Sequence, residues 1–172
     1  LDVELATSVG PNRTVSFEAL GGTAGVNLTG NGENNVLIGS QFDDTLTGGA
    51  GTELLTGGSG NDTFIVDNGT DSISDLGTGL DIVQVSASAT ANATIINAGG
   101  YTATSSSSNN GILNVTLAGT VLATETVSLA SLVGSNGVSL TGNNNANDLI
   151  GSANNDTITG GSGNDTLTGG SG

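Results

Sequence analysis

Residues 30–65 read GNGENNVLI, GSQFDDTLT, GGAGTELLT and GGSGNDTFI, four nine-residue segments without a gap between them. Each segment begins with Gly, usually has Asp or Asn at its sixth position, and carries an apolar residue at its eighth. Weaker copies flank them, GGTAGVNLT at 21–29 and VDNGTDSIS at 66–74. Self-similarity at a fixed period is typical of a repeat architecture, in which each unit packs on its neighbours. The stretch therefore predicts a repetitive fold with a thin core.

A second array and a longer period are also present. Residues 133–168 read VGSNGVSLT, GNNNANDLI, GSANNDTIT and GGSGNDTLT. Residues 1–60 align with residues 113–172 without a gap, at an offset of 112, and 33 of the 60 positions are identical. Because 112 is not a multiple of nine, the longer unit must contain nonapeptides and a spacer.

The spacer differs from the arrays in its pattern. Leu113, Val115 and Leu117 alternate with polar residues, which is typical of a β-strand. The triplet Asn109-Asn110-Gly111 separates Tyr101–Thr104 from Ile112–Leu117, and Asn and Gly tolerate the positive φ of a hairpin turn. No apolar period of a helix is present. We therefore predict a small antiparallel β insert between the two arrays.

The nonapeptides resemble those of the RTX (repeats-in-toxin) family, whose pattern is GGxGxDxUx. GGSGNDTFI at 57–65 and GGSGNDTLT at 160–168 fit every position. The resemblance implies an all-β, right-handed parallel β-roll, a β-solenoid in which two nonapeptides make one coil. The expected organisation is the end of a preceding β spacer (1–20), a first roll (21–83), a β-rich spacer (84–132) and a second, incomplete roll (133–172).

Charge and composition exclude several classes of function. The formal net charge is -15, with sixteen acidic residues against one basic residue, Arg13. Binding to nucleic acid needs clustered Lys and Arg, so it is not expected. The chain has no Cys and no His, which excludes thiol chemistry and His-based catalysis. No apolar run is long enough for membrane insertion. We therefore expect a protein that is not an enzyme on its own.

The sixth positions predict where Ca²⁺ binds. With two nonapeptides per coil, as the resemblance implies, these side chains stack at about 4.8 Å, and two carboxylates about 5 Å apart repel by roughly 3 kcal/mol at an effective dielectric of 20. Ca²⁺ reverses this repulsion because it takes six to eight oxygen ligands. The candidate ligands stand at, or close to, sixth positions. They are Asn35, Asp44, Glu53, Asp62, Asp71 and Asp81 in the first array, and Asn147, Asp156 and Asp165 in the second. Asp81 is one residue out of phase. The spacer, with Glu125 as its one acid, is expected to bind no calcium.

Two functional classes fit these features. The first is a calcium-binding structural repeat of a large extracellular protein, such as a surface layer, a filament or an adhesin. The second is a calcium-triggered folding and secretion module attached to an RTX enzyme or toxin. The resemblance implies type I secretion and a place outside, or on the surface of, a Gram-negative cell. The long repeat, nonapeptides and spacer together, favours the first class. Open roll ends expose strand edges, so end-to-end self-association is also expected.

Overall fold

The fold is an all-β solenoid without a helix in residues 1–96, 99–122 and 125–172, the residues that the computed structural model describes. Accordingly, no helix in these ranges is long and apolar enough to cross a membrane. The strands are β1 (Asp2–Glu4), β2 (Arg13–Ser16), β3 (Asn27–Thr29), β4 (Asn35–Ile38), β5 (Thr45–Thr47), β6 (Leu54–Thr56), β7 (Thr63–Val66), β8 (Gly69–Leu76), β9 (Ile82–Val85), β10 (Ala89–Ile95), β11 (Tyr101–Thr102), β12 (Ser108–Asn109), β13 (Ile112–Leu117), β14 (Thr126–Ser128), β15 (Val133–Gly134), β16 (Val138–Thr141), β17 (Asp148–Ile150), β18 (Thr157–Thr159) and β19 (Thr166–Thr168).

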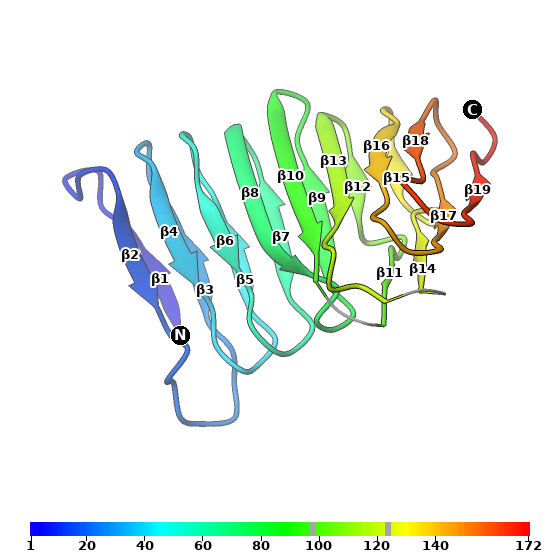
Figure 1. The fold of residues 1–172 in the computed structure, drawn as a ribbon. Coiled ribbons are helices and arrows are strands. Elements are labelled where there is room, and N and C mark those ends of the chain that lie inside the picture. The colour runs from blue at the N-terminus through cyan, green and yellow to red at the C-terminus, as the bar shows by residue number, and fades with distance from the viewer. Residues whose placement is uncertain (97–98, 123–124) are drawn as a thin grey trace.

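The strands form three parallel sheets that lie along the solenoid (Figure 1). Sheet A has the order β1-β3-β5-β7-β9-β12-β15, sheet B has the order β18-β16-β13-β10-β8-β6-β4-β2, and sheet C has the order β11-β14-β17-β19. In the first array the chain alternates between sheets A and B. Each pass through both sheets makes one coil, and the next coil stacks on it.

The strand register confirms a parallel solenoid with two nonapeptides per coil in the arrays. Leu28 pairs with Leu46, and Leu46 pairs with Phe64, so that each step along the sheet spans two nonapeptides. These eighth-position side chains point inward and are fully buried, as are Leu37 and Leu55 on sheet B. The core is therefore a stack of single apolar side chains on each side of the coil. In the last strand, Leu167 is 48% exposed because no further coil of the described chain covers it.

The prediction of an antiparallel insert is wrong, because every strand pair is parallel. β12 pairs with β9 and β15 in sheet A, whereas β13 pairs with β10 and β16 in sheet B. The Asn109-Asn110-Gly111 triplet carries the chain from one sheet to another. None of its three residues has a positive φ, which a tight hairpin turn requires. Alternation with period two is the same for both strand directions, so it did not identify the partner.

The spacer enlarges the coil from two sides to three. Ala91 pairs with Leu113 and Leu113 pairs with Val138, and both steps are longer than the two nonapeptides that make a coil of the first array. The extra residues form sheet C, which begins with β11. Sheet A ends at β15, and the second array alternates between sheets B and C. Sheet B therefore runs through both arrays and the spacer. The proposed domain boundaries within this continuous sheet stay a prediction.

Candidate metal sites

One column of sixth-position residues lies at the start of the sheet A strands. Oδ1 of Asp44 accepts a hydrogen bond from the backbone N of Val26 at 2.7 Å, and Oδ1 of Asp62 accepts one from the backbone N of Asp44 at 2.9 Å. Oδ1 of Asp81 accepts one from the backbone N of Asp62 at 2.9 Å. Each carboxylate is therefore held by the backbone of the preceding coil. The structure brings Asp44, Asp62 and Asp81 into one stack.

The second column lies at the start of the sheet B strands and contains Asn35, Glu53 and Asp71. Oδ1 of Asp71 accepts a hydrogen bond from the backbone N of Glu53 at 3.0 Å. Oδ1 of Asn35 accepts one from the backbone N of Asn31 at 3.1 Å. All three side chains are buried, with exposed fractions of 2% or less. Glu53 stands where the pattern has Asp, and its longer side chain lies beside Asp71.

Several buried oxygens in these columns have no hydrogen-bond partner in the part of the chain that the structure describes. They are Oδ2 of Asp62, Oδ2 of Asp71, and both carboxylate oxygens of Glu53. A buried charge without a partner is strongly unfavourable, so such groups are normally paired or coordinate a metal. The chain has sixteen acidic residues, a single basic residue, Arg13, and no His. The donor set of carboxylates therefore fits a hard, oxygen-seeking cation such as Ca²⁺.

Burial also raises the pKa values of several acids in the two columns. Burial, together with the neighbouring Asp71, raises the pKa of Glu53 to about 8. Burial raises the pKa of Asp62 to about 7, with the nearby Asp81 and Asp44 adding to the effect. The pKa of Asp71 and that of Asp81 are also raised by burial. Without a cation, burial therefore favours the protonated forms of Glu53, Asp62, Asp71 and Asp81.

The first glycine of a nonapeptide leaves room for the carboxylate of the sixth residue. A Cβ added to Gly57 would overlap Oδ2 and Cγ of Asp62. The same overlap with a sixth-position carboxylate occurs for Gly39 with Asp44 and for Gly160 with Asp165. This explains why the pattern pairs Gly at position one with Asp at position six.

The second array repeats the arrangement with fewer acids. Oδ1 of Asp156 accepts a hydrogen bond from the backbone N of Val138 at 2.8 Å, and Oδ1 of Asp165 accepts one from the backbone N of Asn147 at 3.0 Å. Each stacked pair here contains one carboxylate, whereas Asp44 and Asp62 form a pair of two. The second array therefore holds less negative charge per coil.

Asp75 is a buried acid that the sequence analysis missed. Its carboxylate accepts hydrogen bonds from the backbone N of Gly57 at 3.1 Å and from that of Gly58 at 2.8 Å. It is 5% exposed, and burial raises its pKa. Asp75 stands where the nonapeptide period places a first position, which Gly normally occupies. An acid at that position was the available signal, and attention to sixth positions alone overlooked it.

Backbone carbonyls would have to complete any ion site. Among the residues described, no three Asp, Glu, His or Cys side chains gather into a group that could hold a metal ion. Each stacked pair of sixth-position residues thus offers one or two carboxylates. Ca²⁺ accepts backbone carbonyl oxygens as well as carboxylates, in flexible geometry. The arrangement fits a cation held between coils by mixed ligands.

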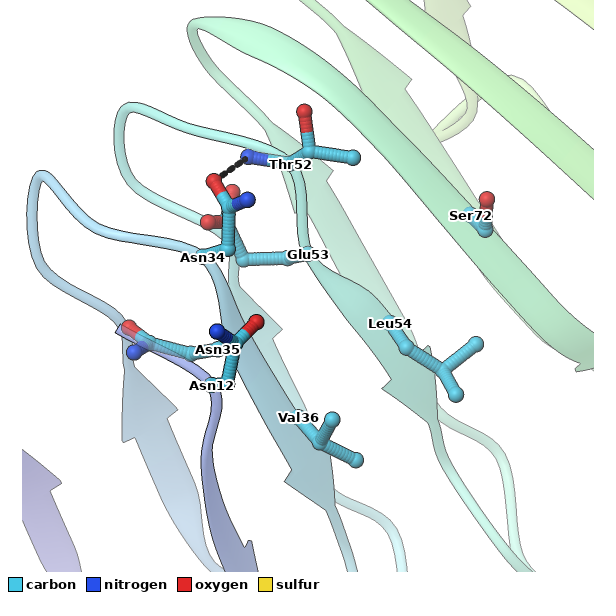
Figure 2. Close-up of a pocket in the computed structure, with 8 residues that line it drawn as sticks. All are labelled: Asn12, Asn34, Asn35, Val36, Thr52, Glu53, Leu54 and Ser72. Carbon is cyan, nitrogen blue, oxygen red and sulfur yellow. Dashed lines mark hydrogen bonds between the residues drawn. The ribbon is translucent and has the colours of Figure 1, made fainter.

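A surface pocket opens beside the sheet B column (Figure 2). Its volume is about 390 Å³, and its lining includes Asn35, Glu53 and Leu54. At its rim, the backbone N of Thr52 donates a hydrogen bond to Oδ1 of Asn34 at 3.0 Å. The pocket therefore reaches two residues of this column, Asn35 and Glu53.

Comparison with known proteins agrees with this geometry. The model of the RTX calcium-binding nonapeptide repeat matches residues 29–64 and 141–172, in four copies. No curated protein and no solved structure matches the chain. The matched stretches contain Asp44, Glu53 and Asp62 of the first array and Asp156 and Asp165 of the second. Both arrays therefore contain RTX calcium-binding nonapeptide repeats.

Proposed function

We propose that this chain is a secreted structural repeat module of a large extracellular protein, and that it folds and assembles when it binds calcium. The observation that carries the proposal is the set of buried carboxylate oxygens without a partner on Glu53, Asp62 and Asp71. A fold that buries acids in this way is unfavourable without a cation. Ion binding therefore becomes part of the folding free energy.

The candidate ligands fall into groups that lie along different sheet edges. Asp44, Asp62 and Asp81 would hold ions along the edge of sheet A, and Asn35, Glu53 and Asp71 along the edge of sheet B. Asn147, Asp156 and Asp165 would do so in the second array. Bound Ca²⁺ supplies the positive charge that neutralises neighbouring carboxylates and links consecutive coils. In the folded chain, the backbone N–H groups of Val26, Asp44 and Asp62 hold the carboxylates in place by hydrogen bonds.

The tandem organisation favours a structural role over a module attached to an enzyme or toxin. Two arrays lie on one continuous eight-stranded sheet, and the long unit of nonapeptides and spacer recurs along the sequence. One roll is enough for a secretion signal, whereas a scaffold gains length from each added unit. We therefore place the protein in a surface layer, a filament or an adhesin outside a Gram-negative cell. It has no catalytic role of its own in this proposal.

Circular dichroism in the far ultraviolet tests the calcium dependence. We expect a disordered spectrum in chelator and a β spectrum after Ca²⁺ is added in excess. Equal concentrations of Mg²⁺ should be less effective, because Mg²⁺ demands near-octahedral geometry and gives up its water reluctantly. A β spectrum that is unchanged by chelator would reject the mechanism.

Light scattering in calcium tests the structural role. Strand edges at the two ends of the solenoid favour end-to-end association, so we expect particles larger than the monomer whose size grows with concentration. A strictly monomeric, fully stable particle would favour the alternative, a folding module of an RTX enzyme or toxin.

A further inference from the structure

The chain contains four Asn-Gly pairs, and the structure holds them in different ways. They are Asn31-Gly32, Asn68-Gly69, Asn110-Gly111 and Asn136-Gly137. In such a pair the backbone N of the glycine is a nucleophile that lies close to Cγ of the asparagine, and glycine has no Cβ to hinder its approach. The hydrogen bonds of each pair decide whether this nitrogen reaches Cγ in the folded chain.

The side-chain amide nitrogen is held in two of the pairs. Nδ2 of Asn31 donates hydrogen bonds of 2.9 and 3.0 Å to two backbone carbonyl oxygens, those of Ala6 and Val9, and the side chain is 8% exposed. Nδ2 of Asn136 likewise donates hydrogen bonds of 3.0 and 2.8 Å to two backbone carbonyl oxygens. Deamidation expels this nitrogen as ammonia, so both hydrogen bonds of each amide would be lost.

Asn110 is held through its carbonyl oxygen and through the glycine that follows it. Oδ1 of Asn110 accepts hydrogen bonds from the backbone N of Ser135 at 3.1 Å and from Oγ of the same residue at 3.3 Å. The backbone N of Gly111 donates its hydrogen bond to Oδ1 of Asn109, at 3.2 Å. The attacking nitrogen and the carbonyl group that it would attack are therefore bound to different partners.

Asn68 differs from the other three, because its carbonyl group contacts the backbone N of its own glycine. The backbone N of Gly69 donates a hydrogen bond to Oδ1 of Asn68 at 2.9 Å. Cγ lies one C=O bond of about 1.23 Å from this oxygen, so the nucleophile and its target are already neighbours. Asn68 is exposed, and no other hydrogen bond holds its side chain in the part of the chain that the structure describes.

We infer that Asn68 is a site of spontaneous deamidation in the folded chain. The backbone N of Gly69 gives its proton to water or hydroxide and forms a bond to Cγ of Asn68. The bond between Cγ and Nδ2 then breaks, and the nitrogen takes up a proton and leaves as ammonia, so that a cyclic succinimide remains. Water opens this ring at either carbonyl carbon and gives aspartate or isoaspartate. Water is the co-reactant, and nothing is oxidised or reduced.

The modification changes the segment between two acids of the first array. Oδ1 of Asp67 accepts a hydrogen bond from the backbone N of Gly49 at 3.1 Å, and Asp71 is a candidate ligand of the sheet B column. Aspartate at position 68 adds a carboxylate next to Asp67, in a chain whose net charge is already -15. Isoaspartate instead lengthens the main chain between Asp67 and Asp71 by one carbon atom. Both products therefore alter the connection to this column.

The rates of deamidation at the four pairs, measured in one molecule, test the inference. The chain is kept in heavy-oxygen water at mildly alkaline pH, once folded in calcium and once unfolded in urea with chelator. Circular dichroism establishes both states. Peptide mapping by mass spectrometry measures the heavy oxygen incorporated at each asparagine. The ratio of the folded to the unfolded rate at each pair separates the effect of the structure from that of the local sequence.

We expect the ratio at Asn68 to exceed the ratio at each other pair by about tenfold or more, because only there does the reaction break no hydrogen bond to another segment. The other three pairs are the internal controls. Equal slowing at all four pairs on folding would overturn the inference. So would a higher ratio at Asn31, Asn110 or Asn136 than at Asn68.

The variant Asn68→Gln is the matched control at the site itself. Glutamine keeps the amide but would have to close a larger ring, so the variant should lose heavy-oxygen incorporation at position 68 and keep the rates of the other three pairs. Unchanged incorporation in the peptide that contains position 68 would count against the assignment. The reaction needs no bound ion, and folding is measured separately, so failure here is distinct from failure of calcium-dependent folding.

Discussion

Oδ1 of Asp81 accepts a hydrogen bond of 2.9 Å from the backbone N of Asp62, although Asp81 stands one residue later than two nonapeptides would place it. The register of β8 against β10 shifts between Ile73 and Leu76. Oδ2 of Asp81 accepts a hydrogen bond from the backbone N of Gly77 at 2.8 Å. Asp81 therefore continues the column of Asp44 and Asp62 in spite of the shift in period.

Replacing Asp81 should weaken the last coil of the first array. Asp81→Ala leaves the buried N–H of Asp62 without its acceptor and removes one candidate ligand. We expect a loss of about 1–3 kcal/mol in the free energy of unfolding in calcium. Urea denaturation measures the loss. Glu33→Ala, at an exposed position, is the control and should stay within about 0.5 kcal/mol of the native chain. Equal stability of the two variants would contradict the role of Asp81.

The first array should bind calcium more tightly than the second. Asp44 and Asp62 supply two carboxylates to neighbouring levels, whereas Asn147 and Asp165 supply one. Asp62→Ala should therefore raise the calcium concentration at the folding midpoint more than Asp165→Ala does. Isothermal titration calorimetry compares the two variants, and similar losses of affinity would show that the count of carboxylates does not set the order.

Gly57 should not tolerate a methyl group. An alanine Cβ would overlap the carboxylate of Asp62, whereas a Cβ on Gly32 meets no atom within 4 Å. Because neither glycine has a positive φ, the contrast isolates the steric effect. Gly57→Ala should cost about 1–3 kcal/mol in unfolding free energy, with a lower calcium affinity. Thermal denaturation of the two variants, Gly57→Ala and Gly32→Ala, measures this difference in stability.

The calcium-free chain should respond to pH. The raised pKa values of about 8 for Glu53 and about 7 for Asp62 mean that the folded state binds more protons than the unfolded state. This contribution to stability is complete below the unfolded pKa, near 4, and is lost as the pH rises towards 7 to 8. Metal-free protein should therefore gain β signal on acidification from pH 8 to pH 5. Calcium binding near pH 7 should release protons, which calorimetry in buffers of different ionisation enthalpy detects. A metal-free spectrum without pH dependence would disagree with these pKa shifts.

The repeats predicted more than the spacer did. Period nine predicted the inward side chains of Leu37, Leu46 and Leu55 at the eighth position, and the resemblance to the RTX family implied the coil of two nonapeptides. The spacer has no such period. Its alternation around Leu113 suits any half-buried strand, and the parallel partners of Leu113, which are Ala91 and Val138, lie at unequal separations along the chain. Local pattern does not contain that information.

The candidate ligands were likewise predicted only in part from the sequence. The sequence placed Asp44, Asp62 and Asp71 at sixth positions, and the structure stacks them in two columns. The burial of Asp75 depends on its contact with Gly57 and Gly58, and the loss of phase at Asp81 follows a register shift near the end of β8. That contact forms between segments separated by about one coil, so a reading of single nonapeptides did not reveal it.

The exchange of sheet A for sheet C changes the direction in which equivalent residues face. Val3 of β1 lies in sheet A, whereas Val115 of β13, its counterpart in the second copy of the long unit, lies in sheet B. The two copies of the unit are thus related by a screw, with a rotation about the solenoid axis as well as a translation. The acid columns lie at the edges of sheets A and B in the first array, and at the edges of sheets B and C in the second. Ions bound in the two arrays would therefore lie at different angles about the solenoid axis. They would link neighbouring coils on different sides of the molecule.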